Sequence, residues 1–118
     1  MKVQDASVQA PDRIGRVSIV IPMFNEARHV PRLVDDLARQ DYDGEVEIIV
    51  ADGGSTDGSA ELLEKHAEKA GLTLTVIDNP ERAVPSGLNR CIALARGDLI
   101  IRMDCHSRFP ADYVRRCV

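Results

Sequence analysis

The stretch Val17-Ser18-Ile19-Val20-Ile21-Pro22 decides the fold class of this chain of 118 residues. Residues 17–21 are almost continuously apolar, which is typical of a parallel strand covered by helices on both faces. Further strand-like runs follow at 46–51, 72–77 and 99–103. Segments of helical spacing lie between them, at 30–38, 59–70 and 86–96, and Pro110 suits the start of a short final helix. This alternation predicts an α/β fold with a mainly parallel sheet.

Length and composition fit one domain with a real core. The chain has a mass of 13.0 kDa, and 44% of its residues are apolar. Gly71 follows the second predicted helix and is expected to end it. Residues 1–13 are polar and aperiodic, so we expect a flexible leader there and the folded unit at 14–118. No apolar run approaches the roughly 18 residues that cross a bilayer.

Charge and cysteine content narrow the possible partners and compartments. The net charge is −4 and no dense Lys/Arg run is present, which argues against a nucleic-acid partner. Three cysteines without a C-x-x-C spacing favour reduced thiols, and the leader lacks the apolar core of a secretion signal. We therefore expect a cytoplasmic location.

Three polar loops follow predicted strands, at 22–26, 52–59 and 104–107. In an open parallel sheet such loops converge at the carboxyl ends of the strands, where ligands bind. The glycine-rich loop 52–59 matches neither the P-loop nor G-x-G-x-x-G. Its Asp52 could accept hydrogen bonds from a base or from ribose hydroxyls. Alternatively, Asp52 and Asp57 serve only to cap turns and the second helix.

The loop after the fourth predicted strand offers two metal-ligating groups. Asp104 and His106 are two residues apart, so in extended backbone their side chains share a direction. Carboxylate and imidazole both ligate divalent ions such as Mn²⁺. The alternative for His106 is a surface turn. His29 and His66 are interpreted as solvated surface residues, and Arg82 as either a solvated charge or a phosphate contact.

Taken together, three segments strongly resemble the family 2 glycosyltransferases, both in their order along the chain and in their spacing. They are 17–22 with Asn25 and Glu26, 50–59, and Gly97-Asp98 leading to 102–106. The Asp-x-His variant with Phe109-Pro110 resembles the succinoglycan-type exopolysaccharide branch. The resemblance covers residues 16–118. It implies a Rossmann-like GT-A fold that binds a nucleoside-diphosphate sugar with Mg²⁺ or Mn²⁺ and transfers the sugar with inversion.

The resemblance also assigns roles to residues. It implies that Pro22, Phe24 and Glu26 line the nucleoside pocket and that Asp52 contacts the base. Asp104 would face the ribose or the metal, and His106 would replace the second carboxylate of the family's D-x-D motif. Arg82 is a further candidate for donor binding.

The family's general base normally lies well downstream of D-x-D, and no carboxylate of this chain can be matched to it. We therefore expect 14–118 to be a donor-binding half, truncated after the fourth strand, that does not turn over alone. Its exposed sheet edge could support self-association into a homo-oligomer. The expected donor is a UDP-sugar and the expected acceptor a polysaccharide or a lipid-linked sugar, met at the inner face of the membrane.

Two other functions stay open from the sequence. The chain could be a non-catalytic nucleotide-sugar-binding or regulatory module that acts through a partner chain. It could also be an unrelated Rossmann-like enzyme that uses a dinucleotide, although the glycine fingerprint of such enzymes is missing.

Overall fold

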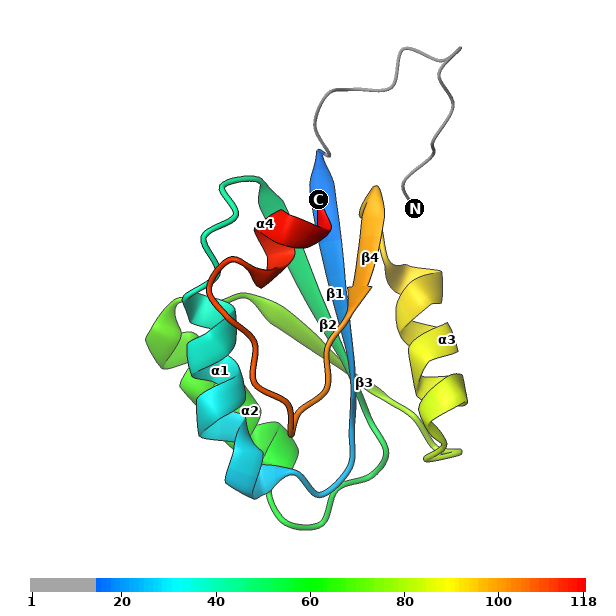
Figure 1. The fold of residues 1–118 in the computed structure, drawn as a ribbon. Coiled ribbons are helices and arrows are strands. Elements are labelled where there is room, and N and C mark those ends of the chain that lie inside the picture. Colours follow the sequence, from blue (N-terminus) through cyan, green and yellow to red (C-terminus); the bar gives the residue numbers. More distant parts are fainter. Residues whose placement is uncertain (1–14) are drawn as a thin grey trace.

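The structure, a computed structural model, describes residues 15–118, and the expected leader at 1–13 lies outside this range. Its centre is a sheet of four parallel strands in the order β3-β2-β1-β4 (Figure 1). The strands are β1 (Arg16–Met23), β2 (Glu45–Asp52), β3 (Leu74–Asp78) and β4 (Leu99–Arg102). The parallel α/β architecture predicted from the sequence is confirmed.

Helices cover both faces of the sheet. The helical elements are η1 (Ala27–His29), α1 (Val30–Ala38), α2 (Ser59–Ala70), α3 (Val84–Leu94) and α4 (Tyr113–Cys117). Figure 1 shows α1 and α2 on one side of the sheet and α3 on the other. None of the helices described in 15–118 is long and apolar enough to cross a membrane.

The side chains of β1 alternate between two cores, as the strand period requires. Ile19 and Ile21 pack with Leu33 of α1 and Leu63 of α2 in the larger core. Val20 points the other way, into a smaller core beneath α3. Because both faces of β1 are buried, its sequence is continuously apolar rather than alternating.

The order of the strands places a crevice at their carboxyl ends. The chain passes from β1 through α1 to β2 and β3, and then returns through α3 to β4 on the opposite side of β1. The strand order therefore reverses between β1 and β4, and the loops that follow these two strands lie at this topological switch point, where ligands bind in folds of this kind.

The turn Gly97-Asp98 fixes β4 beside β1. The N–H of Gly97 donates to Oγ of Ser18 at 2.8 Å, and a Cβ on Gly97 would lie only 2.5 Å from that oxygen. A side chain at this position would therefore push the turn off the sheet. The carboxylate of Asp98 accepts the N–H groups of Gly15 and Arg16, both at 3.1 Å, and so anchors the start of β1.

Candidate functional site

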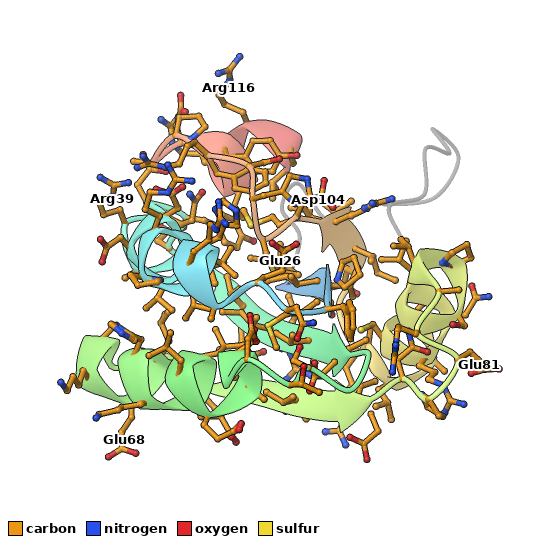
Figure 2. All side chains as sticks on the ribbon, turned by 90° about the horizontal axis from the view of Figure 1, so that it is seen from below. Glu26, Arg39, Glu68, Glu81, Asp104 and Arg116 are labelled. Atoms are coloured by element: carbon orange, nitrogen blue, oxygen red, sulfur yellow. The ribbon has the colours of Figure 1, made fainter. Side chains whose placement is uncertain are left out.

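A cleft opens at the carboxyl end of the sheet. Figure 2 looks onto this end from below and labels Glu26 and Asp104, two of the residues that line the cleft. Most of the residues predicted to form a site line this one cleft. They are Pro22, Phe24, Glu26, Arg82, Asp104 and His106. The topology thus brings together three segments that are far apart in the sequence, with Glu26 and His106 separated by 80 residues.

The loop after β1 is held in place by the loop after β2. The N–H of Asn25 donates to Oγ of Ser55 at 2.8 Å, and Oδ1 of Asn25 accepts the N–H of Thr56 at 2.8 Å. Asn25 itself has a left-handed φ of 51°, which asparagine tolerates better than most residues. These bonds link the two loops directly, so their relative position does not depend on a ligand.

Asp57 and Ser59 continue this connection. The carboxylate of Asp57 accepts the N–H groups of Ser59 and Ala27, both at 3.0 Å, and Oγ of Ser59 accepts the N–H of Glu26 at 2.8 Å. Hydrogen bonds, the strongest from the hydroxyl of Ser59, lower the pKa of Asp57. Asp57 does not cap α2 as predicted, because Gly58 is the N-cap residue and, among the described residues, no side chain caps the helix there. Its carboxylate instead closes a turn onto Ser59, the first residue of α2, and orients the backbone next to Glu26.

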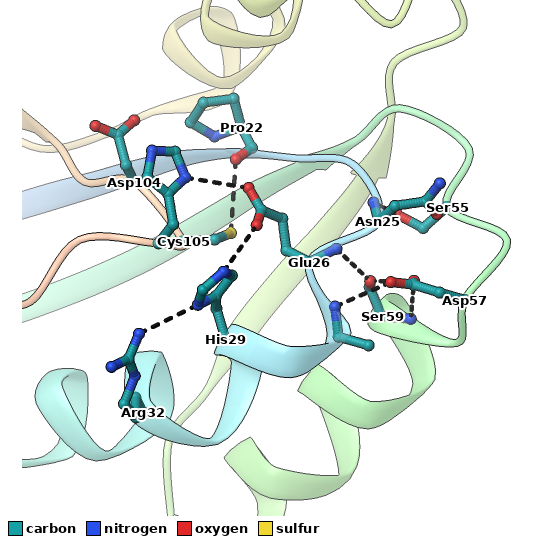
Figure 3. Close-up of polar contacts among 12 residues, drawn as sticks. Pro22, Asn25, Glu26, His29, Arg32, Ser55, Asp57, Ser59, Asp104 and Cys105 are labelled. Carbon is teal, nitrogen blue, oxygen red and sulfur yellow. Dashed lines mark hydrogen bonds and ion pairs between the residues drawn. The ribbon is translucent and has the colours of Figure 1, made fainter.

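The carboxylate of Glu26 lies between two imidazole rings (Figure 3). Oε2 is 3.3 Å from Nδ1 of His106, and Oε1 is 3.9 Å from Nε2 of His29. The interpretation of His29 as a solvated surface residue is wrong, because its side chain is only 24% exposed and faces Glu26. Sequence reasoning missed this contact, because His29 reaches Glu26 only through the turn of η1.

Asp104 is paired with Arg102, which was not among the predicted site residues. Nη2 and Nε of Arg102 lie 3.0 and 3.2 Å from the same carboxylate oxygen of Asp104. Arg102 also lines the cleft. The signal was present in the sequence, because Arg102 and Asp104 have the same two-residue spacing as Asp104 and His106.

Asp52 lies beside the cleft rather than in its lining. Its carboxylate accepts the N–H and the hydroxyl of Ser55 at 3.1 and 2.6 Å, as in the turn-capping alternative. Burial, and after it the negative charges of Glu26, Asp104 and Asp52, raise the pKa of the Cys105 thiol to about 12. The contact of Asp52 with a base stays a prediction.

Arg82 and Phe24 form one wall of the cleft. The guanidinium of Arg82 lies over the ring of Phe24, 4.5 Å from its centroid, and Nε donates to the carbonyl oxygen of Gly53 at 3.0 Å. A Cβ on Gly53 would come within 3.0 Å of Cγ of Arg82. Gly53 therefore leaves room for Arg82 to lie against the end of β2, where it is held in place despite its exposure.

The segment that follows His106 is anchored to α1 by a buried acid. Asp36 is 1% exposed, and its carboxylate accepts Nε of Arg108 and the N–H of Phe109, both at 3.0 Å, together with a bond from Arg39. Burial would raise the pKa of Asp36, but these bonds outweigh it and lower that pKa. Asp36 thus fixes the loop that carries Asp104 and His106.

The residues present fit a divalent ion that arrives with phosphate. Within the described part of the chain, no three His, Cys, Asp or Glu side chains are grouped closely enough to hold a metal by themselves. Asp104 and His106 both line the cleft and stay the two predicted ligands. Mg²⁺ sites near phosphates typically use one or two protein ligands, with water and phosphate oxygens completing the shell.

Comparison with known proteins identifies the family. The family model described as glycosyl transferase family 2 matches residues 18–118. The chain belongs to this family. The match includes all three of the loops that meet at the cleft.

Two curated relatives illustrate the range of similar sequences. The succinoglycan biosynthesis protein ExoA of Rhizobium meliloti is 38% identical over 85% of this chain and 31% of its own length. The undecaprenyl-phosphate 4-deoxy-4-formamido-L-arabinose transferase of Proteus mirabilis is 31% identical over 91% of this chain and 34% of its own length. The chain therefore spans about a third of the length of these relatives.

Solved structures confirm the GT-A fold. The mannosyltransferase of Pyrobaculum calidifontis, in complex with GDP-Man and Mn²⁺, has a TM-score of 0.77 and 30% identity over 84% of this chain and 29% of its own. TarS of S. aureus in complex with UDP has a TM-score of 0.73 and 22% identity over 86% of this chain and 30% of its own. The second likeness concerns the fold alone.

Proposed function

We propose that this chain provides the donor site of a glycosyltransferase that moves a sugar from a nucleoside-diphosphate sugar to a polysaccharide or a lipid-linked acceptor. The observation that carries the proposal is the convergence of Phe24, Glu26, Arg82, Asp104 and His106 on one cleft at the switch point of the sheet. The polysaccharide and undecaprenyl-phosphate named for the relatives support these acceptor classes. A lipid-linked acceptor would be met at the inner face of the membrane, where we place the reaction.

In this proposal the wall formed by Phe24 and Arg82 takes the nucleoside end of the donor, because an aromatic ring and a guanidinium both stack on a base. Asp52, beside that wall, would accept a hydrogen bond from the base. The UDP found with Mn²⁺ in glucosyl-3-phosphoglycerate synthase of Mycobacterium tuberculosis, 29% identical over 76% of this chain, supports uridine as the nucleoside. The GDP-Man complex above makes guanosine the alternative to test.

Asp104 and His106 would hold the divalent ion at the diphosphate. When bound there, Mn²⁺ or Mg²⁺ stabilises the negative charge that grows on the leaving diphosphate. Nδ1 of His106 already faces Glu26, which leaves Nε2 as the ring nitrogen for the metal. Glu26 therefore orients the imidazole, and Asp36 orients the loop.

The state of the cleft side chains favours direct displacement, and hence inversion. Glu26 is engaged by imidazoles and Asp104 by Arg102, while the thiol of Cys105 is buried with its pKa raised to about 12. None of these described groups is prepared to act as a covalent nucleophile. No carboxylate of the chain can be matched to the base that deprotonates an acceptor, so we assign this chain to donor binding and expect the base from outside it.

Thermal unfolding with nucleotides tests the proposal. UDP with Mn²⁺ should raise the unfolding temperature clearly more than UDP alone, while ADP and NAD with Mn²⁺ should have little effect, because a ligand that binds the native state stabilises it more the tighter it binds. A larger effect of NAD than of UDP or GDP would overturn it. Mixing the chain with the remainder of a family member and restoring transfer would exclude a purely regulatory module.

A further inference from the structure

Arg102 closes β4 and has no role in the donor site as described so far. Its guanidinium places two nitrogens, Nη2 and Nε, at 3.0 and 3.2 Å from a single oxygen of Asp104. The side chain is 51% exposed and that of Asp104 is 35% exposed. A half-exposed pair of this kind is weakly held, so the arginine can exchange partners at little cost.

This pair opposes metal binding in the absence of nucleotide. A divalent ion at Asp104 would have to displace the guanidinium or accept a positive charge within a few ångström of its own. The described residues offer no group of three ligands to offset that repulsion. In the nucleotide-free cleft, Arg102 therefore already neutralises the negative charge of Asp104, at the position where the metal would bind.

A diphosphate reverses this balance. Its negative charges compensate the metal, and its oxygens give the guanidinium fork a partner that matches its geometry better than a single carboxylate oxygen. Arg102 lines the same cleft as Asp104 and His106, so the exchange requires only rotation of its side chain.

We propose that Arg102 is the specificity-determining residue that makes metal binding depend on nucleotide: it pairs with Asp104 in the empty cleft and transfers to the diphosphate when donor and metal bind together. The inference rests on the proposed donor site. It assigns to one side chain the coupling free energy between metal and nucleotide, which is reciprocal by linkage.

The test measures both affinities in wild type and in Arg102→Gln. Binding of Mn²⁺ alone, followed by the loss of the free-ion signal in electron paramagnetic resonance, should tighten about three- to fivefold in the variant, because a competing positive charge is gone. UDP affinity at saturating Mn²⁺, measured by titration calorimetry, should weaken about tenfold, because a charged phosphate contact is lost. The two affinities thus change in opposite directions.

Two further variants separate charge from structure. Arg102→Lys keeps the positive charge and should keep weak binding of Mn²⁺ alone, while losing part of the UDP affinity that the planar fork provides. Arg90→Gln removes an exposed arginine of α3 that pairs with Glu81, and should change neither affinity. The unfolding temperature of Arg102→Gln without ligands should match wild type, as expected for a surface pair.

Different outcomes distinguish this inference from the proposed function. If wild type binds UDP with Mn²⁺ but Arg102→Gln binds Mn²⁺ alone no more tightly than wild type, only the role of Arg102 is overturned. A loss of affinity for both Mn²⁺ and UDP in Arg102→Gln would also overturn only the role of Arg102, since it would indicate that this residue supports the structure of the cleft. If wild type binds neither UDP nor GDP with Mn²⁺, the donor site and the role of Arg102 fall together.

Discussion

Nδ1 of His106 lies 3.3 Å from Oε2 of Glu26, although 80 residues separate them in the sequence. This contact joins the loop after β1 to the loop after β4, across the point where the strand order reverses. Glu26 is held from below by its own backbone bond to Ser59, and the imidazole is held by Glu26. The contact therefore orients a proposed metal ligand before any ligand arrives (Figure 3).

Removing the imidazole should weaken donor binding only when metal is present. In His106→Ala, UDP affinity with Mn²⁺ should fall about tenfold, because a metal ligand is lost, while the weak affinity for UDP without metal should stay the same. Titration calorimetry measures both. His66→Ala on α2 is the matched control and should have no effect. Equal UDP affinity of His106→Ala and wild type in Mn²⁺ would exclude the role of this residue.

Neutralising Glu26 should act through His106. Glu26→Gln keeps the size of the side chain but loses the charge that faces both imidazoles, so UDP affinity with Mn²⁺ should fall about three- to tenfold. In the double variant with His106→Ala, the additional loss from Glu26→Gln should largely disappear, because interacting residues are not additive. Glu68→Gln, exposed on α2, is the control. Full additivity of the two losses would show that Glu26 acts independently of His106.

Asp36 should be important for stability, because replacing its carboxylate by an amide removes the charge and turns one acceptor oxygen into an NH2 group that cannot accept from Arg108 or from the N–H of Phe109. Asp36→Asn should lower the free energy of unfolding by about 2–4 kcal/mol at neutral pH. Asp35→Asn, on the exposed side of the same helix, should cost less than about 0.5 kcal/mol. Urea unfolding measures both variants, and similar costs at the two positions would contradict the anchoring role.

The contribution of Asp36 should also depend on pH in a defined direction. Its pKa is lowered in the folded protein from the ordinary value of 3.8, so its stabilisation is complete above that value and is lost as pH falls through the folded pKa. The difference in stability between wild type and Asp36→Asn should therefore narrow in strongly acidic solution. A constant difference from neutral to acidic pH would show that the charge of Asp36 does not contribute.

The three cysteines should differ sharply in reactivity. Cys105 is 2% exposed and its pKa is raised to about 12, and Cys91 is also buried, whereas Cys117 is exposed. Brief treatment of the folded protein with iodoacetamide at about pH 8 should modify Cys117 alone, as mass spectrometry of peptides can show. All three should react after unfolding in denaturant. Rapid labelling of Cys105 in the folded protein would contradict its burial and would mean that this part of the cleft is accessible to solvent.

The sequence predicted the strands best, because burial on both faces leaves a continuous apolar run such as 17–21. It was less accurate where local turns decide a boundary. The third strand begins at Leu74 rather than at Leu72, because the N–H of Leu72 bonds to the carbonyl of Ala67 and, with the left-handed Gly71, closes α2.

Helix starts showed the same limitation. The third helix begins at Val84 rather than at Ser86, since Pro85 occupies its first turn and Ala83 is extended. The final helix begins at Tyr113, after a turn closed by the N–H of Tyr113 and the carbonyl of Pro110, and not at Pro110 itself. In both regions the proline was visible in the sequence, but its distance from the first helical residue was not.

For the site, the residue types at the strand ends were sufficient to predict which residues line the cleft, but not which of their side chains pair with one another. The two-residue spacing of Arg102 and Asp104 indicates that their side chains share a direction, but not that they pair. The contact of His29 with Glu26 depends on the turn of η1. The chain's self-association through its exposed edge strands, β3 and β4, and the role of Asp52 stay predictions.

The most direct test of the donor cleft is a crystal structure of the chain with UDP and Mn²⁺, with the metal located by its anomalous signal. We predict a manganese peak within coordination distance of Asp104 and His106, with the diphosphate on the metal and the uracil beside Phe24 and Asp52. A nucleotide bound away from the carboxyl ends of β1 and β4, or manganese held by other side chains, would contradict it.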